Sequence, residues 1–440
     1  MAKIYPFSGL CYARNRVPLE KVAIQPYDHI SKDTRDYYYD LHPNNIIRVI
    51  LGNSTPEDLT ANVYAGSADY LKQWRANGII EPLPGPAFFI YFQRFQTPDA
   101  RDYHVRKGFV GLGRLEHYSN RVIFPHERTL TRSKEARLEL LRQTRTHLDQ
   151  IFMLYEDPTR HIDSVLDYAA QGKPDIEVED EYGVLHRMWV VMDEKIIAIL
   201  QSSMEDRKLI IADGHHRYEA ALALRDQMNG DAPYDRIPMT FFNMDSPSLT
   251  ILPTHRVVSN LPHFHPSKLF QRAAEFFHIC ERPSVRHEGC TIVTCTDGGH
   301  LSYWLLKSSF NLTSFMPGLS EKERNLDVNV LHRLVIEQCL GIIQEELNKE
   351  SCLSYVREKE NAISAVRSGG AQAAFLMNPT RIDQVRDVAY EGNVMPQKST
   401  DFYPKLLTGL LMFAFEDSAI PGQGLCGRNR REHFAVATDV

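Results

Sequence analysis

The stretch Leu209-Ile-Ile-Ala-Asp213-Gly-His-His-Arg217-Tyr-Glu-Ala-Ala-Leu222 joins an apolar run to a helical pattern through a single glycine. The apolar run predicts a buried strand, and the residues after Gly214 predict a helix. Free backbone N–H groups and the positive end of the helix dipole meet at such a junction, where they favour an anion such as phosphate. The stretch therefore predicts an α/β arrangement with a candidate phosphate site, although a helix start with solvated polar residues fits the same pattern.

The polar side chains at this junction suit the same anion. His215, His216 and Arg217 lie in the expected first helical turn and can donate hydrogen bonds, while Asp213 can cap the helix or hold a cation. Zinc is the alternative ligand for a His-His pair. Adjacent helical residues point about 100° apart, and no Cys-x-x-Cys pair accompanies them. We therefore assign no metal site to this junction.

Strand-like and helix-like patterns alternate on both sides of this stretch. Residues 45–51 and 87–92 are predicted as buried strands, with an amphipathic helix over 59–77 between them. Residues 290–296 and 300–306 are predicted to form a β-hairpin, because the Asp-Gly-Gly turn between them supplies the positive φ that such turns require. The predicted fold class is α/β, mixed with α+β character.

A chain of 440 residues is long enough for two or three domains of ~100–200 residues. We expect an N-terminal α/β region over 1–115 and a core over 116–262, which can include part of 1–50. A C-terminal α/β subdomain is expected over 263–420. The Gly/Arg-rich end, 421–440, lacks periodicity and is predicted to be a mobile tail.

The composition limits the classes of partner that we expect for this chain. Fifty Lys and Arg against 56 Asp and Glu give a net charge of -6, which provides no general attraction to nucleic acid or anionic membranes. There is no secretory signal pattern and no run of ~18 apolar residues. Seven cysteines without a Cys-x-x-Cys pair favour reduced thiols. We expect a cytoplasmic protein with a small-molecule substrate and neither a nucleic-acid nor a membrane partner.

A second candidate element is the basic tract over 125–145, which holds six basic and three acidic residues. Most of this run fits a solvated helix face. Glu127 differs from the other acidic residues because it stands in a Pro-His turn beside arginines. Its carboxylate can act as a general base if the fold brings it near the phosphate site.

The third element is Met395-Pro-Gln-Lys398-Ser-Thr400-Asp-Phe-Tyr-Pro-Lys405. Lys398, with the hydroxyls of Ser399 and Thr400, forms a compact set of phosphate donors, and Lys405 is a further candidate. A proline-braced loop with solvated lysines explains the pattern equally well.

Two further pairs of residues are weaker candidates for substrate contacts. His255 and Arg256 follow a short apolar run, where a strand end with a polar turn also explains them. Tyr27 and Asp28 can serve as acceptor or metal ligands, but a β-turn with a capping Asp accounts for them too.

Together these motifs resemble two known families. Pro125-His-Glu127, 213–217 and 396–400 resemble motifs of the ADP-dependent free-serine kinase family, whose fold is related to ParB and sulfiredoxin. Over residues 1 to ~415 the chain also resembles the DUF1015 family of uncharacterised proteins, through 25–31, 212–221, 252–256 and 398–405. The kinase resemblance implies a ParB/sulfiredoxin-like nucleotide-binding core over 116–262, with an N-terminal extension and a C-terminal α/β substrate subdomain over 263–420.

The kinase resemblance also implies an activity and a set of site residues. The activity is a phosphotransfer between ADP or ATP, with Mg²⁺, and the hydroxyl of a small molecule, with free L-serine or O-phosphoserine as the first candidate. Glu127, Asp213 and His216 are then catalytic, with Glu127 taking the proton from the serine hydroxyl. The implied phosphate contacts are Gly214, His215, Arg217, His126, Arg128, Lys398, Ser399 and Thr400.

This chain departs from the kinase and from sulfiredoxin at two points. About 120 residues precede Pro125, where the kinase has little. His215 stands where sulfiredoxin needs a cysteine, so sulfinic-acid reduction is not expected. Two alternatives stay open because fold alone does not fix function: a nucleotide-binding ParB-like regulator, and a phosphatase of another small phosphorylated metabolite. The net charge of -6 disfavours the regulator as a nucleic-acid binder.

Overall fold

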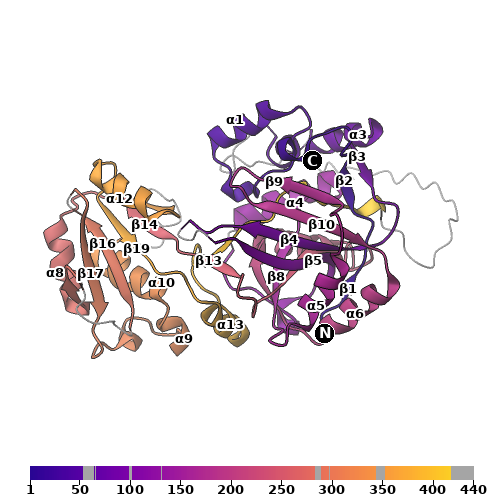
Figure 1. Ribbon diagram of the computed structural model, residues 1–440. Coiled ribbons are helices and arrows are strands. Elements are labelled where there is room, and N and C mark those ends of the chain that lie inside the picture. Colours follow the sequence, from indigo (N-terminus) through magenta and orange to yellow (C-terminus); the bar gives the residue numbers. More distant parts are fainter. Residues whose placement is uncertain are drawn as a thin grey trace, which may run out of the picture.

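The computed structural model describes residues 1–52, 64, 66–98, 102–129, 131–282, 289–296, 298–342 and 352–417. The predicted tail, 421–440, lies outside these residues. The described chain forms two lobes, each built on its own β-sheet (Figure 1). The predicted α/β class with mixed character is therefore confirmed.

The larger lobe contains a nine-stranded sheet of order β6-β11-β8-β12-β5-β4-β10-β9, with β1 paired to β5. Two of its pairings are parallel, β11 with β6 and β12 with β8, and the others are antiparallel. The strands are β1 (Ile4–Tyr5), β4 (Phe88–Phe95), β5 (His104–Arg114), β6 (Ile123–Phe124), β8 (Ile151–Tyr155), β9 (Ile176–Glu179), β10 (Leu185–Val191), β11 (Leu209–Asp213) and β12 (Arg236–Asn243).

Helices cover both sides of this sheet. Figure 1 shows α5 (His161–Ala169) and α6 (Glu194–Met204) below it, and α1 (Lys32–Leu41) and α3 (Ser67–Ala76) above it. Helix α4 (Thr131–Thr144) packs against α3. Their apolar faces and the sheet share one large hydrophobic core. In the described residues, no helix is both long and apolar enough to cross a membrane.

The smaller lobe contains a six-stranded antiparallel sheet of order β15-β17-β16-β19-β14-β18. One core includes side chains of α8 (Pro266–Phe276), α10 (Asp327–Val330) and the following π-helix, Leu331–Cys339. A second core includes α12 (Lys359–Arg367). The predicted hairpin is confirmed, because β16 and β17 pair through Thr296 and His300. The strands are β14 (His255–Val258), β15 (Phe277–Cys280), β16 (Thr291–Thr296), β17 (His300–Leu306), β18 (Leu353–Val356) and β19 (Ala373–Leu376).

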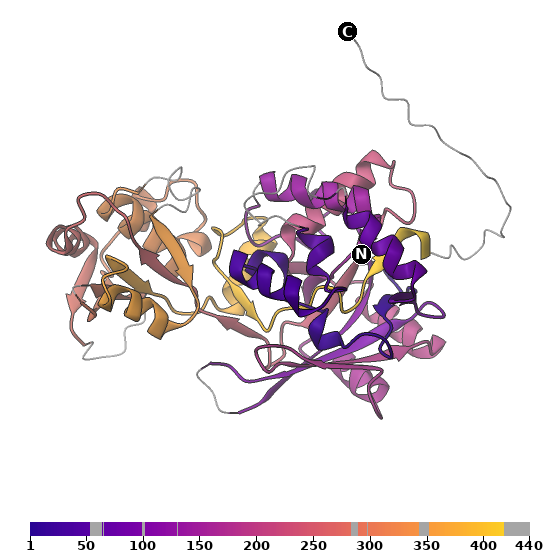
Figure 2. The same cartoon turned by 90° about the horizontal axis from the view of Figure 1, so that it is seen from above.

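After β19 the chain returns to the larger lobe through α13 (Ile382–Glu391) and β20 (Asp401–Tyr403). Side chains of both elements pack into the larger core. β20 pairs with β13 (Thr250–Leu252), the strand that leads out to the smaller lobe. The predicted segment 263–420 thus contributes to both lobes, and the 398–405 stretch is placed where they meet (Figure 2).

The strand predicted over 45–51 is wrong, because the chain forms helix α2 (Ile47–Ile50) there. An apolar run buried on every side fits a strand or a helix equally well. At the start of the helix, the Asn45 side-chain oxygen accepts the N–H of Ile47 at 2.9 Å, which satisfies one of the backbone donors that a helix start leaves without a partner in the helix. Of the helix predicted over 59–77, the described part is α3, and it buries the side chains of Leu71 and Trp74.

Candidate functional site

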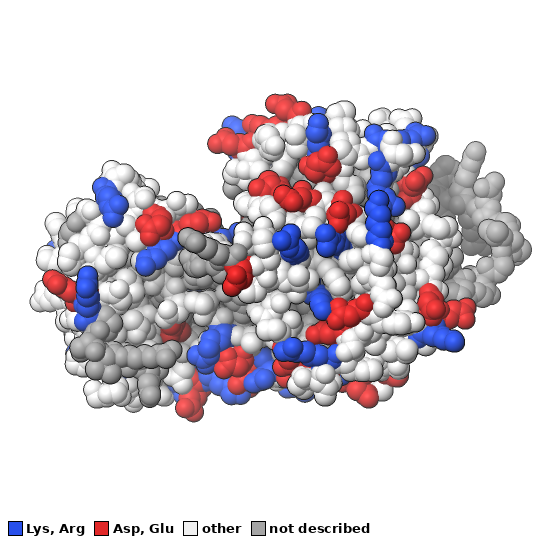
Figure 3. Space-filling model, viewed as in Figure 1, with Lys and Arg blue, Asp and Glu red and all other residues white. Residues whose placement is uncertain are grey.

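A cavity of about 600 Å³ lies between the two lobes, a size typical of sites for small ligands. The larger lobe supplies most of its walls, and the segment around β18 supplies the rest. The lining residues are Asp28, His29, Glu127, Tyr182, Ala212, Asp213, His215, Thr254, Ser354, Tyr355, Arg357, Glu358, Lys398, Thr400, Asp401 and Lys405. Figure 3 shows acidic and basic side chains interspersed over the described part of one face of the molecule.

The strand–glycine–helix junction forms as the sequence predicts. β11 ends at Asp213, Gly214 has φ +93°, and α7 (His215–Gln227) begins immediately afterwards. This φ lies in the left-handed region that favours glycine. Asp213 and His215 both line the cavity, so the N-terminal end of α7 faces it.

Glu127 reaches the same cavity because its strand lies beside β11. β6 pairs in parallel with the start of β11, so the residues after both strands emerge together. The backbone N–H of His126 donates to His215 Nε2 at 3.3 Å. The pairing therefore closes the gap of about 85 residues between the two motifs, and it places the Glu127 carboxylate and the α7 N-terminus in one cavity.

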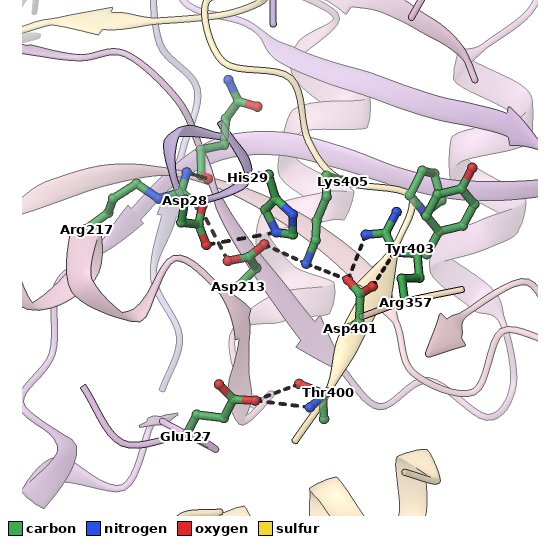
Figure 4. Close-up of polar contacts among 12 residues, drawn as sticks. Asp28, His29, Glu127, Asp213, Arg217, Arg357, Thr400, Asp401, Tyr403 and Lys405 are labelled. Carbon is green, nitrogen blue, oxygen red and sulfur yellow. Dashed lines mark hydrogen bonds and ion pairs between the residues drawn. The ribbon is translucent and has the colours of Figure 1, made fainter. Parts of the chain in front are cut away.

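One oxygen of Glu127 is held by the 398–405 stretch. Oε1 accepts the backbone N–H groups of Ser399 and Thr400 and the Thr400 hydroxyl, each at 3.1 Å. In Figure 4 the other carboxylate oxygen points away from Thr400. Burial alone would raise the pKa of Glu127, but the hydrogen bond and charge of His126 lower it to about 2. Glu127 is thus a carboxylate near neutral pH.

His126 lies fully buried behind this contact. Its Nδ1 lies 2.5 Å from the carbonyl oxygen of Ile211, and its Nε2 lies 2.7 Å from Thr400 Oγ1. A carbonyl oxygen can only accept, so Nδ1 carries a hydrogen. His126 therefore links strand β11 to the loop that holds Glu127.

The buried ammonium group of Lys405 links Asp213, at the end of β11, to Asp401 in β20 (Figure 4). Lys405 Nζ lies 3.2 Å from Asp213 Oδ2 and 3.1 Å from Asp401 Oδ1. Asp401 also accepts from Arg357, at 2.6 Å. Burial would raise the pKa of Asp213, but Lys405 and Arg217 hold it well below its ordinary value. Against the effect of burial, the two aspartates raise the pKa of Lys405.

Asp28 and His29 form a third polar group on the wall, with 4.0 Å between Asp28 Oδ2 and His29 Nε2. Burial would raise the pKa of Asp28, but His29 lowers it. Burial lowers the pKa of His29.

The protein groups present do not fit a magnesium ion held between the cavity aspartates. The Lys405 ammonium already lies between Asp213 and Asp401. Among the residues that the structure describes, no group of three or more His, Cys, Asp or Glu side chains could hold a metal ion. We therefore derive no step through Mg²⁺.

Arg217, His216 and Arg128 lie outside the cavity lining. The Arg217 guanidinium forms ion pairs instead, 3.0 Å from Asp149 Oδ1 and 3.7 Å from Asp213 Oδ1. Burial lowers the pKa of His216, which is half-buried, while the Arg128 side chain is exposed. The predicted phosphate contacts are thus only partly gathered around the cavity.

Four of the other predicted residues also lie behind the wall. Tyr27 is buried beneath the guanidinium of Arg137, 4.0 Å from its ring centre. The Ser399 hydroxyl donates to the Pro396 carbonyl. His255 Nδ1 accepts the backbone N–H of Met377. Arg256 donates to the Lys398 carbonyl at 3.0 Å, so it contacts the loop rather than the cavity.

The cavity also contains residues that sequence reasoning did not select, namely His29, Tyr182, Arg357 and Asp401. His29 and Asp401 stand inside the quoted stretches 25–31 and 398–405, so the signal for them was present. Tyr182 and Arg357 stand in unremarkable local sequence. They reach the cavity only through the sheet of the larger lobe and the placement of β18.

A profile of the DUF1015 family, described as a protein of unknown function, matches residues 4–338. No curated protein matches the chain. Solved structures similar to it include a free serine kinase in complex with AMP, at 14% identity and a TM-score of 0.34, covering 65% of this chain and 88% of that chain. A conserved hypothetical protein from Pyrococcus furiosus is 13% identical, with a TM-score of 0.33 and coverages of 67% and 93%.

A further similar structure is SbnI with a C-terminal truncation, from Staphylococcus aureus. It is 12% identical, with a TM-score of 0.34, and the match covers 68% of this chain and 85% of that chain. Likenesses at this distance do not assign an activity to the chain. The site itself has to carry the functional argument.

Proposed function

Because this chain belongs to the DUF1015 family, a family of unknown function, its activity has to be inferred from its site, and we propose that it is a phosphotransferase. It moves a phosphoryl group between a nucleotide, ADP or ATP, and the hydroxyl of a small molecule. Free L-serine, with O-phosphoserine as the product, is the acceptor to test first.

One observation carries this proposal: the Glu127 carboxylate, the N-terminal end of α7 and the loop 398–400 meet in one cavity. Phosphoryl transfer depends on positioning and on neutralising charge on the transferred group. The α7 N–H groups and Lys398 supply positive potential, and Glu127 supplies a proton acceptor. These groups support the proposal.

In the forward direction, the acceptor oxygen attacks the terminal phosphorus of the nucleotide. A new O–P bond forms, the bond to the leaving phosphate oxygen breaks, and the hydroxyl proton passes to Glu127. Lys405 acts as a positioning residue, because it holds Asp213 and Asp401 at fixed distances from one another. The same site run backwards makes serine from O-phosphoserine.

Arg217 and His216 have no direct part in this scheme, since both lie outside the lining. Arg217 instead fixes the start of α7. Its guanidinium forms an ion pair with Asp149 and donates a hydrogen bond to the Gln150 carbonyl oxygen at 2.9 Å. Its proposed role is to support the shape of the site.

The experiment incubates the purified chain with L-serine and ADP or ATP, and separately incubates O-phosphoserine with AMP or ADP. Products are identified by ³¹P NMR. Glu127→Gln, which retains size but loses proton-accepting power, is the matched control. We expect phosphoserine or serine to form with the wild type. The proposal is rejected if no combination of nucleotide and substrate yields phosphoserine or serine. Release of inorganic phosphate from O-phosphoserine without nucleotide favours the phosphatase alternative.

A further inference from the structure

Glu127 occupies the donors that the sequence assigned to phosphate. The backbone N–H groups of Ser399 and Thr400 and the Thr400 hydroxyl converge on a single oxygen, Glu127 Oε1. Successive N–H groups directed to one point form a concavity that binds anions. In the structure, the anion in this concavity is a side chain of the protein itself.

The loop is held in this shape by contacts other than Glu127. Lys398 has φ +57°, in the left-handed region, and its carbonyl accepts from the buried Arg256 at 3.0 Å. The Ser399 carbonyl accepts from Thr380 Oγ1 at 2.7 Å. The donors are therefore pre-organised, and an anion other than Glu127 meets the same geometry.

We propose that loop 398–400 binds a phosphoryl group of the substrate, and that Glu127 occupies this anion site until the phosphoryl group displaces it. The inference rests on the proposed function only in that the cavity takes a phosphorylated ligand. Two anions cannot accept the same three hydrogen bonds, so phosphate binding and release of Glu127 are one event. The exposed Lys398 side chain, which lines the same cavity, adds a cation for the incoming group.

Displacement also explains how Glu127 becomes a useful base. Held in the loop, Glu127 has a pKa lowered to about 2 by its surroundings, chiefly by His126 acting against burial. Hydrogen bonds to a carboxylate favour the charged form, so losing three of them raises the pKa of Glu127. The base therefore becomes stronger when the phosphoryl group is in place.

The test measures binding of inorganic pyrophosphate to the full chain by isothermal titration calorimetry, so it needs no catalytic turnover. Glu127→Gln and Glu127→Ala both remove the competing charge. Glu358→Gln removes an exposed charge from the same cavity without touching the loop, and is the matched control. Thr400→Val in the Glu127→Gln background removes one donor, while Thr400→Ser retains it.

We expect both Glu127 variants to bind pyrophosphate about tenfold or more tightly than the wild type, because pyrophosphate no longer competes with a carboxylate for the charge-assisted hydrogen bonds of the loop. Glu358→Gln should change affinity less than threefold, by the weak field of an exposed charge. Thr400→Val should cancel most of the gain, and Thr400→Ser should preserve it.

Equal gains in Glu127→Gln and Glu358→Gln would show a general field effect and overturn the inference. So would a gain that survives Thr400→Val, or pyrophosphate binding to none of the variants. If Thr400→Val does not fold, the comparison of Glu127→Gln with Glu358→Gln still decides. A wild type that makes no phosphoserine while this binding pattern holds would reject the proposed function and leave the inference standing.

Discussion

Replacing Lys405 with methionine removes the ammonium that bridges Asp213 and Asp401 and keeps a side chain of similar length. All three side chains are at most 18% exposed. Removing one partner of a buried ion pair costs ~3–5 kcal/mol, because the remaining charge stays buried. Asp213 retains Arg217 at 3.7 Å and Asp401 retains Arg357 at 2.6 Å. We therefore expect the low end, a loss of about 3 kcal/mol of unfolding free energy at pH 7.

The stability lost in Lys405→Met should depend on pH in a definite direction. In the folded chain the pKa values of Asp213 and Asp401 are lowered, with Lys405 the leading cation in both cases. Such groups add stability above their unfolded pKa of about 3.9, and this stability is lost as the pH falls toward the folded values. In Lys405→Met the folded pKa values rise. The difference between wild type and variant should thus shrink by about 2 kcal/mol between pH 7 and pH 3.

Urea unfolding at pH 7 and pH 3, followed by circular dichroism, measures both quantities. Lys398→Met is the control, because Lys398 lines the same cavity with an exposed side chain. It should change the unfolding free energy by less than about 0.5 kcal/mol. The reasoning is refuted if Lys405→Met unfolds at the wild-type urea concentration at pH 7, or if its loss grows at pH 3.

Two further substitutions test the junction at the start of α7. Arg217→Met should cost about 3 kcal/mol of unfolding free energy, because Asp149 loses this ion pair and Asp213 loses one of its two cations while it keeps Lys405. Unchanged stability with weakened ADP binding in calorimetry would return Arg217 to a phosphate role. Gly214→Ala should cost more than the ~1–2 kcal/mol of a left-handed alanine, because its Cβ would lie 3.0 Å from neighbouring side chains. Gly172 is the control, because it has a similar φ and a Cβ added there meets nothing within 4 Å. Equal losses of melting temperature in Gly214→Ala and Gly172→Ala would contradict a steric cost at Gly214.

The sequence was most informative where a signal is local. The junction over 209–222 was predicted correctly because an apolar run, a glycine and a helical pattern follow one another without a gap. The 290–306 hairpin was predicted from its Asp-Gly-Gly turn in the same way. The segment 45–51 was not, since a short run buried on all sides has no face to set a period. The helix there is fixed by contacts with the rest of the core, which the segment's own sequence does not show.

The assembly of the site could not be read from local patterns. Glu127 and Thr400 are 273 positions apart and meet only because β6 lies beside β11 and the chain returns from the smaller lobe. Arg357 reaches the cavity from the segment after β18, across the gap between lobes. Spacing also could not show that the predicted phosphate donors hold a carboxylate of the same chain. Each of these features depends on long-range packing.

The most direct measurement of the central proposal is transfer of a labelled terminal phosphoryl group from ADP or ATP to L-serine under single-turnover conditions. The wild type should place the label in phosphoserine. Glu127→Gln should do so ~10²–10⁴ times more slowly, the usual effect of removing a general base, while its nucleotide affinity is not weakened. Equal transfer rates in the two proteins, or no labelled phosphoserine with the wild type, would contradict the proposal.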